Sequence, residues 1–187
     1  MKKIILFGDS LFNGFRNHHN TTVITAGLNE RLNNFAQVDN LSKSGATTVE
    51  GLDYLAQLPP DFDLIVIEYG TNDATVWGIT PENYAKNLQK MIDFCKNRKI
   101  IIVGPWKANP NSETAANFIP ENHKKIHKLA KTIAQKNNLL FIDLWKLTDG
   151  EKDVDKLYQA DGLHLTDYGN QKLLNLITPV IKKTLLA

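Results

Sequence analysis

The sequence predicts an α/β protein, a three-layer sandwich in which helices cover both faces of a five-stranded parallel sheet. Strand-like and helix-like segments alternate strictly along the chain, without repeats, linkers or low-complexity tracts. The clearest strand candidates are uninterrupted apolar runs, which is typical of parallel strands buried on both faces. We expect the flavodoxin-like strand order 2-1-3-4-5, because it places the end of the first strand at the switch point where open sheets bind ligands.

Length and composition are those of a soluble globular protein. The 187 residues are 42% hydrophobic and 22% charged, so we expect a single domain over residues 1–187. A net charge of +2 without a long basic run does not indicate a nucleic-acid partner. Cys95 is the single cysteine, so no intrachain disulfide can form, and its helical spacing among apolar residues indicates a core residue.

The N-terminal segment only superficially resembles a signal peptide. The apolar run from Ile4 to Phe7 is too short for such a peptide's hydrophobic region, and no small-residue cleavage site follows it. No stretch of the sequence approaches the length of a membrane span. We therefore expect a cytoplasmic protein, and the sequence leaves its oligomeric state open.

The first half of the chain contains two strand–helix units. Gly8 permits a sharp exit from the first strand. Hydroxyl residues precede both helices, as capping residues do, and Pro59-Pro60 ends the second. The expected ranges are a strand at 4–7, a loop at 13–20, a helix from Thr21 or Thr22 to about Asn33, a strand at 36–41, and a helix from Thr47 or Thr48 through Gln57.

The second half contains three further units, and its strands are the most apolar. Thr80-Pro81-Glu82 predicts a helix start, because a capping hydroxyl precedes proline and an acid in the first turn. Pro179 should kink the last helix or break it near Thr178. The expected ranges are strands at 63–69, 99–104 and 139–145, long loops at 105–119 and before residue 160, and helices from Thr80 to about Asn97, from Pro120 to about Asn137 and from Thr166 onward.

Ser10 follows the first strand, and we hypothesise that it is a nucleophile. Acyl transfer by a serine needs a base, a group that orients the base, and donors for the developing oxyanion. His164 is the candidate base and Asp161, three residues earlier, the candidate orienting group. The alternative interpretations are a turn serine and an ordinary Asp-Gly turn beside a helix-flanking histidine.

The candidate oxyanion donors also follow strands. They are the backbone N–H groups of Ser10 and Gly45 and the side-chain amide of Asn72. Gly45 and Asn72 are also good turn residues, so a structural role is the alternative. Asp73, beside Asn72, is better suited to bracing its loop than to orienting the base.

Several other residues lie where they could serve a site. Trp77, Trp106 and Phe118 stand in loops that follow strands and could line a substrate cleft or belong to the core. His123 and His127 have metal-ligand spacing on a helix, but no third ligand accompanies them, so we expect no metal site. His18 and His19 are expected to be solvated loop residues, and their proximity to Ser10 leaves a role in substrate binding as the alternative.

Four blocks of sequence together resemble the SGNH hydrolase superfamily, also called the GDSL esterases and lipases. They are Gly8-Asp9-Ser10-Leu11, Gly45 after the second strand, Gly70-Thr71-Asn72-Asp73 and Asp161-Gly162-Leu163-His164. The resemblance implies an α/β sandwich, a Ser10–His164–Asp161 catalytic set, and an oxyanion hole of Ser10, Gly45 and Asn72. It implies no metal and no organic cofactor. Phe12 departs from the family pattern, in which a small hydroxyl residue is common, and should alter the wall of the acyl pocket.

These observations predict a serine esterase that cleaves small acyl esters or thioesters through an acyl-enzyme on Ser10. Two alternatives remain. An acyltransferase would use the same residues to pass the acyl group to an acceptor hydroxyl, and a catalytically inactive module would only bind an acylated ligand. The chain is too short for a separate lid domain, so small soluble esters fit better than aggregated triglyceride.

Overall fold

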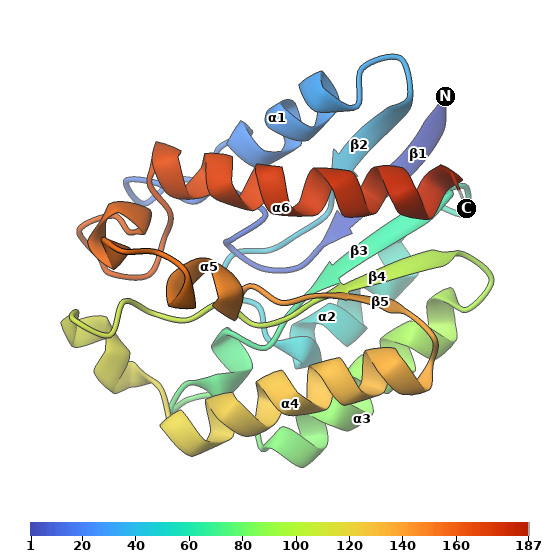
Figure 1. Ribbon diagram of the computed structural model, residues 1–187. Coiled ribbons are helices and arrows are strands. Elements are labelled where there is room, and N and C mark those ends of the chain that lie inside the picture. Colours follow the sequence, from blue (N-terminus) through green and yellow to red (C-terminus); the bar gives the residue numbers. More distant parts are fainter. Residues whose placement is uncertain (187) are drawn as a thin grey trace.

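A five-stranded parallel sheet forms the centre of the protein, in a computed structural model that describes residues 1–186 (Figure 1). The strands are ordered β2-β1-β3-β4-β5, which confirms the predicted order. All four neighbouring pairs are parallel. The strands are β1 (Lys2–Phe7), β2 (Ala36–Asn40), β3 (Leu64–Glu68), β4 (Lys99–Val103) and β5 (Leu140–Ile142).

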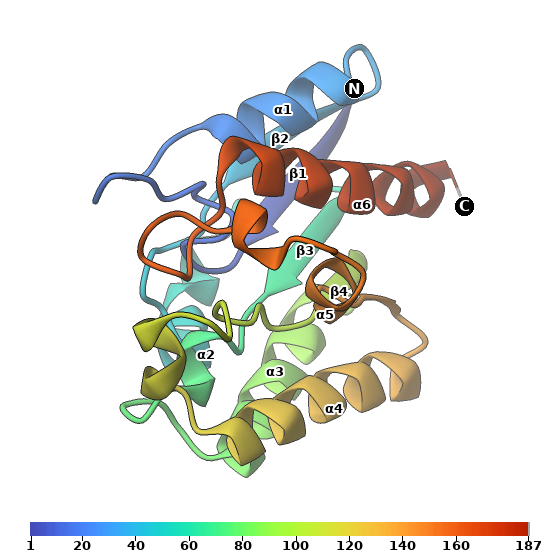
Figure 2. The ribbon, with the colours of Figure 1, turned by 60° about the vertical axis from the view of Figure 1, so that its left-hand side comes forward.

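Helices cover both faces of this sheet (Figures 1 and 2). One face carries α1 (Val23–Arg31) and α6 (Asp167–Leu186), and the short α5 (Trp145–Asp149) lies near it. The other face carries α2 (Thr48–Tyr54), α3 (Pro81–Cys95) and α4 (Pro120–Lys136). The molecule is therefore the three-layer sandwich that the sequence predicts.

Strand β1 shows why the apolar runs of the sequence form central strands. Ile4 and Leu6 pack against the α1/α6 layer, whereas Ile5 and Phe7 pack against the layer of α2, α3 and α4. Each of these four side chains is at most 1% exposed. Successive side chains of a strand point to opposite faces, so a strand covered on both sides must be apolar throughout.

The segment after β5 is more helical than predicted. The strand ends at Ile142 rather than near Trp145, and residues 145–149 form α5. Asp143 explains the early end, because its Oδ1 accepts a hydrogen bond from the Trp145 N–H at 3.2 Å and turns the chain into a helix. Two predicted loops also contain short 3₁₀ helices, Glu113–Asn117 and Val154–Leu157.

Helix α6 runs through Pro179 as one element, so of the two predicted outcomes, a kink or a break near Thr178, the break does not occur. Pro179 and Asn175, whose carbonyl loses its helical donor, both lie on the exposed side of the helix, where water can bind that carbonyl. Thr166 precedes the helix as expected, and its hydroxyl accepts from the Gly169 N–H at 3.2 Å. Across residues 1–186, no helix combines the length and the apolar character that crossing a bilayer requires.

Candidate active site

The candidate site forms at the carboxyl ends of β1, β2 and β3. Gly8 makes the exit from β1 possible, because a Cβ at this position would lie 2.4 Å from the Glu68 carbonyl oxygen. The segment after β2 stays beside this exit, since the Lys43 N–H donates to the Gly8 carbonyl at 2.9 Å. The loops that carry Ser10, Gly45 and Asn72 therefore start from neighbouring strands.

Ser10, His164 and Asp161 form a continuous hydrogen-bonded series. His164 Nε2 lies 3.1 Å from the Ser10 hydroxyl, and His164 Nδ1 lies 2.7 Å from Asp161 Oδ2. With Nδ1 protonated toward Asp161, Nε2 is free to accept the serine proton. The Phe15 ring packs on the imidazole, with 4.5 Å between ring centroids. The structure thus brings together three residues that are up to 154 positions apart.

Asp161 is held as a carboxylate. Its Oδ1 accepts the backbone N–H groups of Leu163 and His164, each at 2.9 Å. Partial burial favours the neutral acid, but these bonds and the bond to the His164 ring outweigh it and hold the pKa of Asp161 below its usual value.

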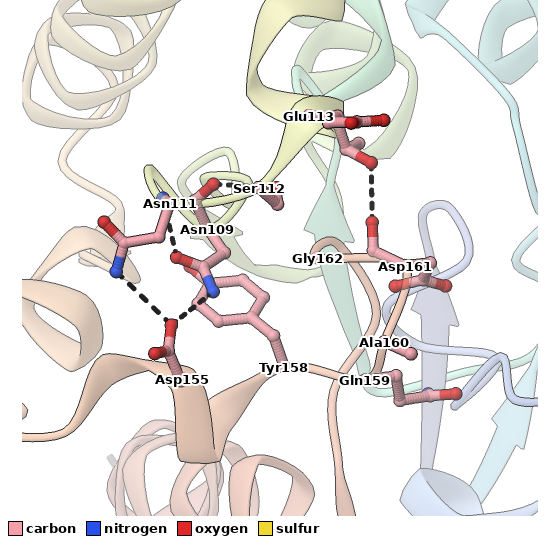
Figure 3. A pocket seen from close by; sticks show the side chains of 11 residues that line it. Asn109, Asn111, Ser112, Glu113, Asp155, Tyr158, Gln159, Ala160, Asp161 and Gly162 are labelled. Carbon is pink, nitrogen blue, oxygen red and sulfur yellow. Dashed lines mark hydrogen bonds between the residues drawn. The ribbon is translucent and has the colours of Figure 1, made fainter.

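The loop after β4 braces the turn at Asp161 and Gly162, which precedes His164 in the chain (Figure 3). The Thr114 hydroxyl donates to the Asp161 carbonyl at 2.6 Å, and the Asn109 N–H donates to the Gly162 carbonyl at 2.7 Å. Gly162 has a φ of +68°, and a Cβ there would lie 2.3 Å from the Ser112 side chain. A polar cavity of 550 Å³ lies between this loop and the turn. The predicted long loop thus contributes to the site as a support.

Gly45 and Asn72 line one cavity of 410 Å³, together with Trp77, Phe118 and Leu163. Gly45 has a φ of +81°, a conformation that favours glycine. The two N–H groups of the Asn72 side chain both have acceptors, Asp9 Oδ2 and the Ala46 carbonyl oxygen, each at 3.0 Å. An oxyanion would have to take one of these N–H groups from its present partner.

The sequence suggested that Asp73 braces its own loop, but its carboxylate holds the first residue of α2, which follows the loop that carries Gly45. Its carboxylate accepts the Thr48 N–H at 3.0 Å and also accepts the Thr48 hydroxyl. Thr48 begins α2, which Thr47 caps. Burial raises the pKa of Asp73 to about 6, although the bonds from Thr48 oppose that shift.

The aromatic candidates divide between pocket and core. Trp77 is 77% exposed and lies with Phe118 at the 410 Å³ cavity. Trp106 is 2% exposed, but it borders the small cleft that contains Ser10 and His164. Phe12 is 0% exposed and packs in the core of the α1/α6 layer, so it does not form the pocket wall that its place beside Ser10 suggested.

The other histidines lie away from Ser10 or face solvent. His127 Nε2 is 2.8 Å from Asp143, and its ring stacks on Trp145. His123 is buried between Phe118 and Trp145, and burial lowers its pKa to about 4. Within residues 1–186, no group of three potential ligands gathers as a metal site would require. His18 and His19 are exposed.

Asp9 and Glu68 are functional candidates that the sequence pattern alone did not reveal. Both side chains are buried beside the site, with exposures of 2% and 0%. Glu68 is the last residue of β3, and it is the acid within the otherwise apolar run from Leu64 to Tyr69. A charged residue in a strand covered on both faces was the available signal, because burying such a group is costly.

Comparison with known proteins finds one matching family model and several similar structures. A family model described as the GDSL-like lipase/acylhydrolase family matches residues 6–172. The crystal structure of a lipase/acylhydrolase from Enterococcus faecalis superposes with a TM-score of 0.90 at 30% identity, covering 98% of this chain and 96% of that one. A carbohydrate acetylesterase from Sinorhizobium meliloti shares the fold, with a TM-score of 0.75 at 22% identity over 98% of this chain and 99% of that one.

One curated relative comes from Homo sapiens. The isoamyl acetate-hydrolyzing esterase 1 homolog is 28% identical in an alignment 142 residues long, which covers 64% of this chain and 55% of the relative. The matched region therefore spans about half the length of that relative.

Proposed function

The chain belongs to the GDSL-like lipase/acylhydrolase family, and from that premise we propose that it is a serine esterase with Ser10 as nucleophile, His164 as base and Asp161 as the group that orients His164. The observation that carries the proposal is the hydrogen-bonded series in which His164 lies 3.1 Å from Ser10 and 2.7 Å from Asp161. This geometry fits the needs of nucleophilic catalysis, because it offers a hydroxyl, an acceptor for its proton and a carboxylate that stabilises the resulting imidazolium.

In the acylation step, Ser10 Oγ attacks the carbonyl carbon of the ester and His164 Nε2 takes the hydroxyl proton. The tetrahedral intermediate carries its negative charge on the former carbonyl oxygen, which accepts hydrogen bonds from the N–H groups of Ser10 and Gly45 and from the Asn72 side chain. The intermediate collapses, His164 returns the proton to the leaving alkoxide, and the alcohol departs. Ser10 now carries the acyl group.

Deacylation repeats these steps with water as the nucleophile. His164 removes a proton from the water as it attacks the acyl carbonyl, and then gives that proton to Ser10 Oγ as the acid leaves. The cleft that contains Ser10 and His164 has a volume of 10 Å³, room for about one water molecule. The proposed reaction needs neither a metal nor an organic cofactor, because the imidazole carries the proton in both steps.

The surroundings of Ser10 favour a small substrate. The narrow cleft at the hydroxyl suits a short acyl group, and the 410 Å³ cavity lined by Trp77 and Phe118 gives room for one moderate organic group. Trp77 and Phe118 would contact that group, while Trp106 would border the reacting carbonyl. The name of the human relative, an isoamyl acetate-hydrolyzing esterase homolog, points in the same direction. We propose small acetyl esters as the substrate class.

A panel of nitrophenyl esters with acetyl, butyryl, octanoyl and palmitoyl groups tests this proposal on the wild type and on Ser10→Ala. We expect the highest kcat/KM for acetate and a steady decline with chain length. Ser10→Ala should lower kcat by at least about 10³-fold, as expected when the nucleophile is removed. Equal turnover by Ser10→Ala would contradict the assignment of the nucleophile, and a maximum at octanoate would contradict the substrate class.

A further inference from the structure

Two buried carboxyl groups lie beneath the candidate oxyanion site, and the proposed reaction does not use them. Asp9 follows β1 and Glu68 ends β3, and these two strands are neighbours in the sheet (Figure 2). The Asp9 N–H donates to Glu68 Oε2 at 3.3 Å. Two acids this close and this deeply buried cannot both ionise without a large cost, so the pair is expected to keep a proton.

The hydrogen-bond partners show which acid holds that proton. Asp9 Oδ1 accepts the Leu11 N–H at 2.9 Å, and Asp9 Oδ2 accepts a side-chain N–H of Asn72 at 3.0 Å. Glu68 Oε1 is buried and lacks a partner among residues 1–186. Donors stabilise a carboxylate, whereas an unpartnered buried oxygen favours the neutral acid. The negative charge therefore belongs on Asp9 and the proton on Glu68.

The surroundings of the pair act in the same direction. Burial first, and then the charges of Asp9 and Asp73, raise the pKa of Glu68 well above its usual value. Burial also raises the pKa of Asp9, to about 6, against the opposing effects of the Leu11 N–H, a hydrogen bond with Glu68 and the charge of His164. Both shifts agree with the assignment from the hydrogen bonds, in which Asp9 carries the charge and Glu68 the proton. Two buried phenols, Tyr69 and Tyr84, also face these acids and stay neutral, because burial raises the pKa of each.

Asn72 connects this pair to the reaction. One of its side-chain N–H groups is bound to Asp9, and the other is bound to the Ala46 carbonyl at 3.0 Å. Freeing the N–H that is bound to Asp9 would break a hydrogen bond to a buried carboxylate. Freeing the N–H that is bound to Ala46 would break only a hydrogen bond to a neutral carbonyl. Bonds to charged groups are the stronger of the two kinds. The N–H now on Ala46 is therefore the one available to an oxyanion.

We propose, resting on the function proposed above, that Glu68 retains its proton and donates it to the Asp9 carboxylate, which anchors Asn72 so that its second N–H turns from Ala46 to the oxyanion. Asp9 and Glu68 are thus positioning residues for the oxyanion donor. Neutral Glu68 also keeps the pair at a single negative charge. A second charge there would oppose the negative charge that develops on the substrate.

Two replacements of Glu68 separate this role from a packing role. Gln keeps an N–H for Asp9 and an acceptor for the Asp9 N–H, so we expect kcat within about 3-fold of wild type. Met fills a similar volume but cannot donate, so kcat should fall about 10-fold with KM unchanged, as for a lost bond to a charged group. Because Met leaves the buried Asp9 N–H without an acceptor, the thermal midpoint of Glu68→Met should fall, whereas that of Glu68→Gln should not.

Two spectroscopic measurements test the protonation of Glu68 and its effect on Asn72 without relying on turnover. The infrared spectrum of wild type at pH 7 should contain the carbonyl band of a protonated carboxylic acid. Both Glu68 variants should lose it, and Glu82→Gln, at an exposed acid of α3, should keep it. The NMR signals of the Asn72 side-chain amide should move in Glu68→Met and stay in place in Glu68→Gln.

The possible failures are distinguishable. A missing carboxylic acid band in wild type would overturn the inference, and so would equal kcat values for the Gln and Met variants. If wild type cleaved no ester while the band and the Asn72 signals behaved as stated, the proposed function would fail. The protonated pair and its hold on Asn72 would then stand, and their role in catalysis would be refuted.

Discussion

Asp161 is the residue whose role is most open to a direct test, because it contributes little to the core. Its side chain is 46% exposed, and its contacts are with the His164 ring and the backbone of its own turn. Its proposed task is to fix which imidazole nitrogen carries the proton, a task that an amide cannot perform for a protonated ring.

We predict that Asp161→Asn lowers kcat by about 10³-fold or more, while the midpoint of urea unfolding changes little. Steady-state kinetics with an acetyl ester and equilibrium unfolding check the two parts. Asp153→Asn is the matched control, since it removes an exposed acid from the same loop and should leave kcat unchanged. Normal turnover by Asp161→Asn would exclude the assigned role.

For individual residues, the residue types that the chemistry needs could be predicted from the sequence, but the direction of every side chain could not. His164 lies within hydrogen-bond reach of both Ser10 and Asp161, as predicted. Phe12 shows the limit. Alternation fixes side-chain directions only within a strand, and Phe12 lies in the turn beyond β1, where the chain sends it into the core. Glu68 stayed unassigned because its partner, Asp9, is 59 positions away and meets it only across the sheet.

Among the elements, the first turn of α2 depends on Asp73, which joins the loop after β3 to the loop after β2. Its carboxylate accepts both the N–H and the hydroxyl of Thr48. Gly45 lies three residues before Thr48, so this bond also steadies a proposed oxyanion donor.

We predict that Asp73→Ala destabilises the protein by about 2–3 kcal/mol, because it leaves buried donors on Thr48 unsatisfied. It should also lower kcat, since the Gly45 segment loses its anchor. Urea unfolding and acetyl-ester kinetics measure the two effects. Thr47→Ala provides the comparison: it removes only the α2 cap, at a cost of about 1 kcal/mol. If Asp73→Ala kept full kcat, Gly45 would not depend on this contact.

Pro179 lowers the stability of helix α6, and a single substitution can remove this effect. Pro179 lacks the N–H that would bind the Asn175 carbonyl, and both residues are exposed. Proline is about 3 kcal/mol less favourable than alanine in a helix interior, and the stiffer unfolded chain offsets about 1 kcal/mol of that difference.

We predict that Pro179→Ala raises the free energy of unfolding by about 1–2 kcal/mol. The ester kinetics should not change, because Pro179 is exposed and lies about 18 Å along α6 from Asp167, where the helix begins after His164. Thermal unfolding followed by circular dichroism measures the gain. A lower midpoint would show that the proline fits a bend that the packing of α6 requires.

The regular elements were the predictable part of the fold because each has a local cause. A capping hydroxyl with proline behind it marks the start of α3, where the Thr80 hydroxyl accepts from the Asn83 N–H. Helix α5 was missed because Leu144 and Trp145 continue the apolar run of β5, and the signal that ends the strand is one hydrogen bond from the Asp143 side chain. The spacing of apolar residues in the sequence does not reveal such a hydrogen bond.

For the whole molecule, the buried acids should make stability depend on pH in an unusual direction. A carboxyl group whose pKa is raised in the folded protein keeps a proton that the unfolded chain has already released. Its contribution to stability is therefore full below the unfolded pKa, near 4, and declines as the pH rises toward the folded value. Glu68, with a pKa raised by burial, is the strongest case.

We predict that Glu68→Gln becomes progressively more stable than wild type as the pH rises from about 4.5 to 7, by up to about 1.4 kcal/mol per pH unit. Urea unfolding of both proteins across this range measures the difference. Buried neutral His123, with a pKa lowered to about 4, acts oppositely, since its stability is lost as the pH falls below the unfolded value near 6.5. Because both proteins contain His123, its effect cancels in the difference between their free energies of unfolding. If the difference in free energy of unfolding between Glu68→Gln and wild type stayed constant with pH, Glu68 would be ionised in the folded protein.

The strand order also belongs to the whole molecule, and it was predictable because the alternation of strands and helices restricts the sheet to few topologies. The order β2-β1-β3-β4-β5 brings the ends of β1, β2 and β3 together. The proposed catalytic residues come together because these three strand ends are adjacent and because the loop before α6 returns to them.

The covalent state of Ser10 tests the central claim most directly. Wild type and Ser10→Ala are treated with a fluorophosphonate at neutral pH, and intact-mass and peptide mass spectrometry then locate any adduct. A nucleophilic Ser10 predicts one phosphonyl adduct per chain, mapped to the peptide that contains Ser10, blocked by prior incubation with an acetyl ester and absent from Ser10→Ala. An unlabelled wild type, or an adduct on another residue that persists in Ser10→Ala, would contradict it.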